Sequence, residues 1–493
     1  MTPNYKKKSQ VVTMASKSSI KIGDDVVHID QQLLFQRLTV TARKTEVDVK
    51  EVFKYELCSY PPALFDDSGM MLSSNKAALA DGLWNKYMSS TSTTLPIRPH
   101  YVIDGGSLLY RISWPKSVSY SDIIDMYCDY VIRKYGHATV VFDGYDGTPS
   151  TKDSAHARRR GDKTHLKMKF SLDMIVPAKK DSIFHNDFNK QRFISLLAKE
   201  LVRRGCQVNH AKGDADTLIV NTTVKSADNV PTVLVGDDTD LLILLLAHVS
   251  TLSEPVYFVP EPKKRQKKDP RIWDVQCLKN KLGNAVCRRL LFVLAMSGCD
   301  TTSRLFGQNK MDILKMASQE GELAYIADQF LASTSRENVQ RHGKRAMFMI
   351  YNGCKTECTD LDTLRHIQFE DKAASSFTHV SCSSLPPTSA ATAFHALRVY
   401  YQIQVWLNLG DELNVLDWGW KMSNGKLCPI HTDLPPAPSG VLKVIRCGCK
   451  GDCASFRCSC KKHGLECSTA CRECRGSSCA NTGFTASDTA DTA

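Results

Sequence analysis

Cysteines are crowded into one short segment near the end of the chain. Nine of the nineteen cysteines lie between residues 447 and 479, where the neighbouring residues are basic and few are hydrophobic. Such a segment cannot bury an apolar core, and thiolates packed this densely replace the core by binding a soft metal ion. The predicted metal ligands are Cys447, Cys449, Cys453, Cys458, Cys460, Cys467, Cys471, Cys474 and Cys479.

The number and spacing of these cysteines indicate how many ions they bind. They follow the pattern C-x-C-x3-C-x4-C-x-C-x6-C-x3-C-x2-C-x4-C. Nine ligands cannot be divided into separate tetrahedral sites, but they satisfy three zinc ions if three sulfurs each bridge two ions. Disulfides are the alternative, and the odd number of cysteines and the C-x-C pairs argue against them. His463 is a further candidate ligand, although a lone histidine beside lysines is more often exposed.

The segment from Cys447 to Cys471 resembles the tesmin-type CXC domain. In that family nine cysteines in a similar order fold around three zinc ions and bind DNA, whereas a related zinc cluster before some methyltransferase domains is purely structural. The chain differs at the second gap and the last two gaps, and it has one copy instead of two. Phe456 stands near the position of the family's aromatic residue. The resemblance implies DNA contacts by Lys450, Arg457, Lys461 and Lys462.

The charge of the chain points to a polyanionic partner. The net charge is +12 over 493 residues, with basic runs at 158–169 and 263–268. Clustered positive charge is typical of proteins that bind nucleic acid, and the run KKRQKK predicts a nuclear location. The longest apolar run, Leu241–Ala247, is too short to cross a bilayer, and no secretory signal is evident at the start. An intracellular protein without a membrane partner is therefore expected.

The centre of the chain alternates between strand and helix patterns. The predicted strands are 100–103, 138–142, 208–211 and 232–235, and the predicted helices between and after them are 120–135, 189–204, 214–224 and 240–248. This alternation predicts an α/β fold with a parallel sheet flanked by helices. Residues 254–270 are predicted to be an irregular, charged excursion. The second half is predicted to be mainly helical, with helices that include 338–369 and 390–405.

Every predicted strand leads to an aspartate. Since the carboxyl ends of parallel strands meet at one edge of the sheet, these acids are expected to gather there. Single aspartates usually cap helices, but so many like charges in one place need a counter-ion, and hard divalent cations supply it. Two Mg²⁺ or Mn²⁺ ions at such a site would activate water to attack a phosphodiester. The candidate catalytic residues are Asp104, Asp143, Asp214, Asp216, Asp238, Asp240 and Asp300.

The order of these motifs resembles the flap endonuclease family. The motifs are VIDGG, VFDGY, DAD, DDTD and GCD, and they span about residues 98–320. The resemblance implies a PIN-like fold and metal-dependent cleavage of DNA or RNA. It also implies a basic arch that grips the scissile strand after the second acid. The residues that match the arch are Lys152, Arg158, Arg159, Arg160 and Lys163.

These patterns predict a modular chain. The expected parts are a region of unknown role (1–97), a PIN-like nuclease domain (98–330), a helical extension (331–430), a linker (431–446), a CXC zinc cluster (447–480) and a disordered tail (481–493). The predicted function is metal-dependent hydrolysis of DNA or RNA, with the zinc cluster binding DNA. The alternative is an inactive PIN-like scaffold that acts as a zinc-dependent DNA-binding adapter.

Overall fold

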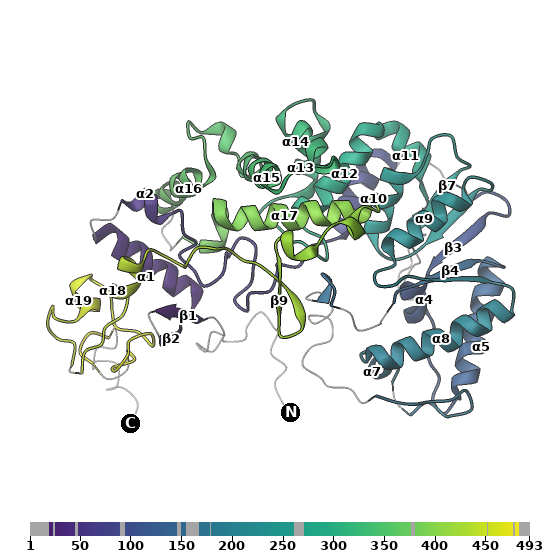
Figure 1. Cartoon of the computed structure of the whole chain (residues 1–493), viewed down its shortest axis with the longest axis horizontal. Coiled ribbons are helices and arrows are strands. Elements are labelled where there is room, and N and C mark those ends of the chain that lie inside the picture. The colour runs from purple at the N-terminus through teal and green to yellow at the C-terminus, as the bar shows by residue number, and fades with distance from the viewer. Residues whose placement is uncertain are drawn as a thin grey trace, which may run out of the picture.

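The structure of the protein is a computed structural model. It describes residues 19–22, 25–44, 48–88, 94–144, 149–153, 167–177, 179–260, 271–375, 380–450, 452–476 and 479–482. The molecule is elongated, with a β-sheet at one end, a helical middle and the cysteine-rich segment at the other end (Figure 1). The predicted combination of an α/β sheet, a helical region and a small cysteine-rich unit is therefore confirmed.

A six-stranded sheet carries the strand-end aspartates. Its strand order is β5-β4-β3-β6-β7-β8, and all neighbours are parallel except β7 and β8. The strands are β3 (His100–Asp104), β4 (Thr139–Phe142), β5 (Gln207–His210), β6 (Thr232–Val235), β7 (Val256–Val259) and β8 (Trp273–Asp274). From β3 the chain first forms β4 and β5 on one side of that strand. It then crosses to the other side of β3, where it forms β6 and β7. The strand order thus changes direction between β3 and β6, and in open α/β sheets ligands gather at the carboxyl edge beside such a switch point.

All four predicted strands are confirmed, but two strands of the sheet, β7 and the two-residue β8, were missed. Strand β7 lies inside 254–270, which the sequence predicts to be irregular. The prediction was wrong because Pro255 and Pro260 suggested a loop, although the short apolar run VYFV lies between them. Alternate residues of this run are buried, as in a strand. Prolines at the ends of a strand do not interrupt its hydrogen bonds, so they mark its limits here.

Helices cover both faces of the sheet because strand side chains alternate between the faces. Val102 and Leu234 face one core, whereas Ile103, Val233 and Val235 face the other. The first core is covered by α3 (Ala77–Leu83), α9 (Asp216–Ser226), α10 (Thr239–His248), α11 (Val275–Leu282) and α12 (Asn284–Ser297). The second is covered by α4 (Gly105–Arg111), α5 (Tyr120–Tyr135), α7 (Lys180–Phe184) and α8 (Asp187–Arg203).

The middle of the molecule consists of helices that extend the first core. They are α13 (Lys310–Ser318), α14 (Glu322–Leu331), α15 (Arg336–Ile350), α16 (Leu361–Ser375) and α17 (Ser389–Trp406). The predicted single helix 338–369 is two helices. The break occurs at Asn352, whose φ of 64° is left-handed and ends the regular hydrogen-bonding pattern. No helix among the described residues combines the length and apolar character needed to span a membrane.

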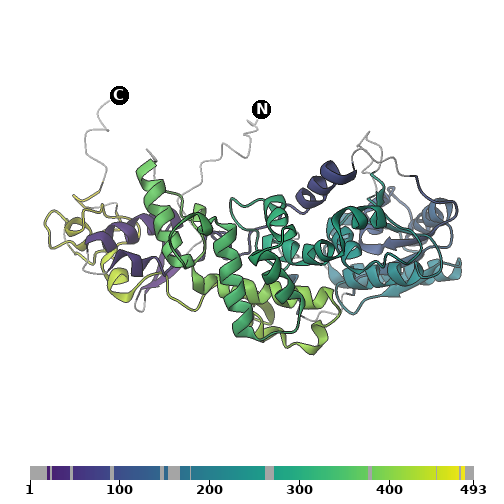
Figure 2. The same cartoon turned by 90° about the horizontal axis from the view of Figure 1, so that it is seen from above.

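The first and last described parts of the chain lie side by side. A hairpin, β1 (Ser19–Ile22) and β2 (Asp25–His28), precedes α1 (Gln31–Lys44) and α2 (Val49–Val52). These elements pack against α18 (Ser439–Val444) and the cysteine-rich segment that contains α19 (Ser459–Lys462). Both views show this arrangement at the end of the molecule remote from the sheet (Figures 1 and 2). A second hairpin, β9 (Trp420–Ser423) and β10 (Lys426–Pro429), connects α17 to this end.

Candidate active site and cysteine cluster

The first two aspartates stand at the carboxyl ends of the central strands. Asp104 is the last residue of β3, and its Oδ1 accepts hydrogen bonds from the N–H groups of Gly106 and Ser107 at 2.8 and 3.2 Å. Asp143 directly follows β4, and its Oδ1 accepts a hydrogen bond from the N–H of Ala215 at 3.0 Å. Asp104 therefore caps α4, as the alternative interpretation expects, but its second oxygen is left for other partners.

Two further pairs and one single aspartate come from the neighbouring connections. Asp214 precedes α9 and Asp216 is its first residue, whereas Asp238 precedes α10 and Asp240 lies in its first turn. Asp300 follows the end of α12. Six of the seven predicted aspartates thus lie at the end of a strand or in the connection that follows it. The seventh, Asp300, lies after helix α12.

Two lysines each contact more than one of the aspartates. The Nζ of Lys76 lies 2.6 Å from Asp238, 3.2 Å from Asp240 and 2.9 Å from Asp300. The Nζ of Lys152 lies 2.5 Å from Asp214 and 2.7 Å from Asp216. Five carboxylates from three connections therefore share two ammonium groups.

The charge of the site is not balanced by these lysines. Removal from water, followed by the charge of Asp143, raises the pKa of Asp104 to about 7. Removal from water and a neighbouring carboxylate likewise raise the pKa of Asp216 and that of Asp240 to about 7 each. Burial by itself lowers the pKa of Lys76, but the nearby aspartates raise it well above its usual value. The ammonium group is therefore held charged, while the site still has a deficit of positive charge.

The residues present fit a divalent cation. The ligands would be carboxylate oxygens, which hard cations prefer. Among the described residues, Oδ1 of Asp240 is shielded from solvent and has no hydrogen-bond partner, which is costly for a carboxylate. Space is also kept free at Gly106, where a Cβ atom would lie 3.1 Å from Asp104 Oδ1 and 3.4 Å from Asp143 Oδ2. A side chain at this position would crowd two candidate ligands.

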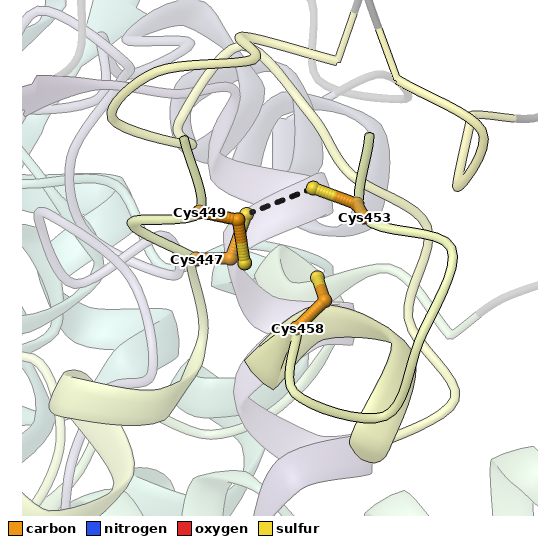
Figure 3. Close-up of side chains that lie close together, drawn as sticks. All are labelled: Cys447, Cys449, Cys453 and Cys458. Atoms are coloured by element: carbon orange, nitrogen blue, oxygen red, sulfur yellow. Dashed lines mark hydrogen bonds between the residues drawn. The ribbon is translucent and has the colours of Figure 1, made fainter. Parts of the chain in front are cut away.

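The nine cysteines converge at the opposite end of the molecule. Their sulfur atoms form four overlapping groups of four, and within each group all sulfurs lie within 4.8 Å of one another. One group is formed by Cys447, Cys449, Cys453 and Cys458, whose side chains point toward one another (Figure 3). Cys447 and Cys467 each belong to three groups, as expected of shared ligands. All nine thiols are free of disulfides.

Hydrogen bonds connect the thiols of the cluster. Sulfur–sulfur distances are 3.8 Å between Cys447 and Cys453 and 3.5 Å between Cys460 and Cys471. The Cys460 thiol lowers the pKa of Cys471 to about 4 by hydrogen bonding to its sulfur. His463 uses Nδ1 for the backbone oxygen of Ser459 at 2.8 Å and belongs to none of the described groups of candidate ligands.

The predicted nucleic-acid contacts are in part exposed. Lys450, Arg457 and Lys462 are exposed, and Lys461 is half-buried and donates to the backbone oxygen of Ala454. Phe456 is 73% exposed beside Arg457, which is unusual for an aromatic side chain. Of the predicted arch residues, Lys152 lies in the acidic site, where it pairs with Asp214 and Asp216. The others, namely Arg158, Arg159, Arg160 and Lys163, lie outside the described residues, as does the basic run 263–268.

Sequence reasoning missed two residues of these sites. Lys76 belongs to the region 1–97, to which no role was assigned, and it contacts three aspartates. Arg37 belongs to the same region, and its Nη2 lies 3.1 Å from the sulfur of Cys460. Neither residue stands in a motif, and a single lysine or arginine in a polar or helical segment gives no sequence signal.

The start of the chain matches one family model. Residues 1–56 match a family model described as a domain of unknown function (DUF8702). No curated protein matches the chain. The matched family covers a small part of the chain, and its description assigns no activity.

Several solved structures of nucleases align with the chain. The catalytic core of Rad2 in complex with DNA substrate is 14% identical, with 63% of this chain and 92% of that chain covered and a TM-score of 0.30. A complex of the bacteriophage T5 flap endonuclease with DNA and metal ions is 10% identical, with 63% and 98% covered and a TM-score of 0.30. The eukaryotic junction-resolving enzyme GEN-1 is 12% identical, with 68% and 75% covered and a TM-score of 0.32.

Proposed function

We propose that this protein hydrolyses phosphodiester bonds in DNA or RNA with the help of Mg²⁺ or Mn²⁺. The observation that supports this function is the gathering of seven aspartates around the carboxyl edge of one sheet, with a deficit of positive charge. Structural networks usually balance such charges with arginines or lysines, whereas sites for phosphate chemistry leave them for metal ions.

Each side chain has a proposed role. Asp104 and Asp240 would hold metal ions, because in each of them one oxygen has no lysine partner at hydrogen-bond distance. Asp143 would hold an ion together with Asp104, because the two carboxylates are close enough for the charge of Asp143 to raise the pKa of Asp104. When bound, two divalent ions would lower the pKa of water and neutralise charge on the phosphate. The ammonium group of Lys152 lies over Asp214 and Asp216, where it would donate to a phosphate oxygen. Asp238 and Asp300 would complete the set of ligands.

The cysteine cluster is proposed to bind three Zn²⁺ ions and to contact DNA. Four overlapping groups of thiols support shared ligands, which three tetrahedral ions require of nine cysteines. Lys450, Arg457, Lys461 and Lys462 would bind backbone phosphates, and the exposed ring of Phe456 would contact bases or sugars. A nuclear location is proposed from the basic run 263–268.

A second candidate function is an inactive scaffold that binds DNA through the zinc cluster. The position of Lys76 favours it, because an ammonium group already neutralises part of the charge of Asp238, Asp240 and Asp300. In such a protein the aspartates would be held by lysines and would need no metal.

A cleavage assay separates the two functions. Labelled flap, hairpin and single-stranded DNA and single-stranded RNA are incubated with the full chain and Mg²⁺ or Mn²⁺. We expect Asp238→Asn to reduce cleavage by at least about 100-fold, because loss of even outer-shell partners of a metal site costs 10–100-fold. The matched control is Asp237→Asn, since Asp237 is the adjacent aspartate, is paired with Arg111 and contacts neither lysine. Absence of cleavage by folded, zinc-loaded wild type would favour the scaffold.

A further inference from the structure

The region that matches a family of unknown function packs directly on the cysteine cluster. Leu34, Phe35 and Leu38 of α1 share one buried apolar core with Val441 and Ile445 at the entrance to the cluster. Ala470, between two of the candidate ligands, belongs to the same core. The two ends of the chain therefore form one packed unit, although more than three hundred residues separate them in the sequence.

Arg37 is the polar centre of this unit. Arg37 is 3% exposed, and its guanidinium group donates to one backbone oxygen just before the cysteine segment and to one inside it. Nε and Nη2 donate to Ile445 O at 2.9 and 2.6 Å, and Nη1 donates to Glu466 O at 2.6 Å. Nη2 also lies 3.1 Å from Sγ of Cys460, which is fully buried.

A buried guanidinium group needs a negative partner, because an unpaired charge in the interior is strongly unfavourable. No carboxylate forms an ion pair with Arg37 in the described part of the chain. When the cluster binds metal, Cys460 would lose the proton that it shares with Cys471, and its thiolate would supply that partner. The same contact compensates part of the negative charge of a cluster in which nine thiolates share a few divalent ions.

A second polar contact fixes the hairpin to the cluster. The carboxylate of Asp25, at the start of β2, accepts hydrogen bonds from Arg446 and Arg472 at 2.6 Å each. These arginines flank the candidate ligands Cys447 and Cys471 directly in sequence. The hairpin and α1 thus hold the start of the cysteine segment and its middle part.

We propose that the hairpin and helix of residues 19–44 form the surface on which the metal cluster is assembled. Arg37 is the positioning residue that holds the thiolate of Cys460. The folding of this N-terminal region and the loading of the cluster are then coupled. Metal binding stabilises α1, and α1 raises the affinity for metal. The reason is that both the metal ions and α1 bind only the ordered form of the cysteine segment. This inference rests on the proposed zinc cluster and is independent of the nuclease site.

The experiment uses the full chain loaded with zinc and measures two quantities. The first is zinc affinity, in competition with a chromophoric chelator, for wild type, Arg37→Met and Arg37→Lys. Arg43→Met is the matched control, because Arg43 lies in the last turn of the same helix and is exposed. We expect Arg37→Met to weaken zinc binding by about 10–100-fold, as outer-shell partners do. Arg37→Lys keeps the charge and is expected to lose less, and Arg43→Met is expected to match wild type.

The second quantity is amide hydrogen exchange in α1 and, as an internal control for folding, in strands β3 and β6. Removal of zinc from wild type should increase exchange in α1 and leave the sheet protected. The coupling is refuted if α1 stays protected after complete zinc removal, or if Arg37→Met binds zinc as wild type does. A wild-type chain that takes up no zinc would instead refute the cluster itself and, with it, the coupling.

Discussion

The ammonium group of Lys76 lies within 3.2 Å of the carboxylates of Asp238, Asp240 and Asp300. The first two follow a strand of the sheet, and the third follows helix α12. The protein itself thus supplies a cation to the site, because Lys76 directly precedes α3. A tethered ammonium group and a divalent ion compete for the same oxygens of Asp238 and Asp240. The balance between them decides how many ions the site accepts.

Replacement of Lys76 tests this competition. Lys76→Met leaves three carboxylates without their cation, so we expect a lower melting temperature in excess chelator and recovery on addition of Mn²⁺. The variant should also bind Mn²⁺ more tightly than wild type, as measured by calorimetry. Lys199→Met, at an exposed position of α8, is the control and should change neither property. Equal Mn²⁺ affinity of wild type and Lys76→Met would show that the lysine does not occupy a cation position.

At the scale of the elements, the middle of the molecule depends on the close approach of α15 and α17. Gly343 of α15 faces Ala396 of α17, and a Cβ atom on the glycine would lie 2.1 Å from the Cβ of Ala396. Glycine in a helix interior lowers its intrinsic stability, so its presence here reflects packing between the two helices.

Gly343→Ala is therefore expected to destabilise the protein. The clash is at the upper end of overpacking costs, about 3 kcal/mol, and exceeds the gain of about 1 kcal/mol from helix propensity. Urea unfolding should show a net loss of about 2 kcal/mol, which Ala396→Gly in the same chain should partly reverse. The control Gly440→Ala lies in α18 where a Cβ atom meets nothing within 4 Å, and it should be neutral or slightly stabilising. A stable Gly343→Ala variant would mean that the helices separate easily.

At the scale of the whole molecule, two histidines, one buried and one half-buried, connect distant segments. Nε2 of His395 in α17 bonds to the backbone oxygen of Met296, and Nε2 of His431 bonds to that of Gly69. Burial lowers the pKa of His395 to about 3 and that of His431 to about 4. Both histidines are therefore neutral in the folded protein at pH values where they are protonated in the unfolded chain.

The sign of the pH dependence follows from this difference. Below the ordinary histidine pKa of 6.5 the unfolded state binds more protons than the folded state, so the free energy of unfolding falls as the pH falls. Each histidine contributes a slope of about 1.4 kcal/mol per pH unit between that value and its folded pKa. The raised pKa values of Asp104, Asp216 and Asp240 act in the opposite direction between about pH 4 and 7.

Because these effects oppose each other, we predict how the pH dependence of the free energy of unfolding differs between variants, and not its overall shape in the wild type. Denaturant unfolding at several pH values should show that His395→Gln loses less stability on acidification than wild type. His137→Gln, at an exposed position, should have the wild-type slope. Identical slopes for wild type and His395→Gln would mean that His395 is not buried as a neutral group.

Much of the fold was predictable because local patterns report local burial. The strand pattern of 232–235 and the helix pattern of 120–135 match β6 and α5 at both ends. The longer prediction 338–369 was wrong about continuity, because the break at Asn352 depends on a backbone conformation that leaves a weak sequence signal. The positions of six of the seven aspartates followed from the strands, whereas Asp300 follows helix α12; the roles of all seven are predictions.

The sequence by itself determined which residue types reach the sheet edge and that nine thiolates lie within a short segment, because chain connectivity and strand period suffice for both. Only the tertiary structure decided that Lys76 enters the acidic site and that Arg37 reaches Cys460. These contacts join segments far apart in sequence, and their formation depends on the path of the whole chain through two cores. A side chain whose partner is distant carries no periodic or motif signal, so its role becomes visible when the fold brings the partner within reach.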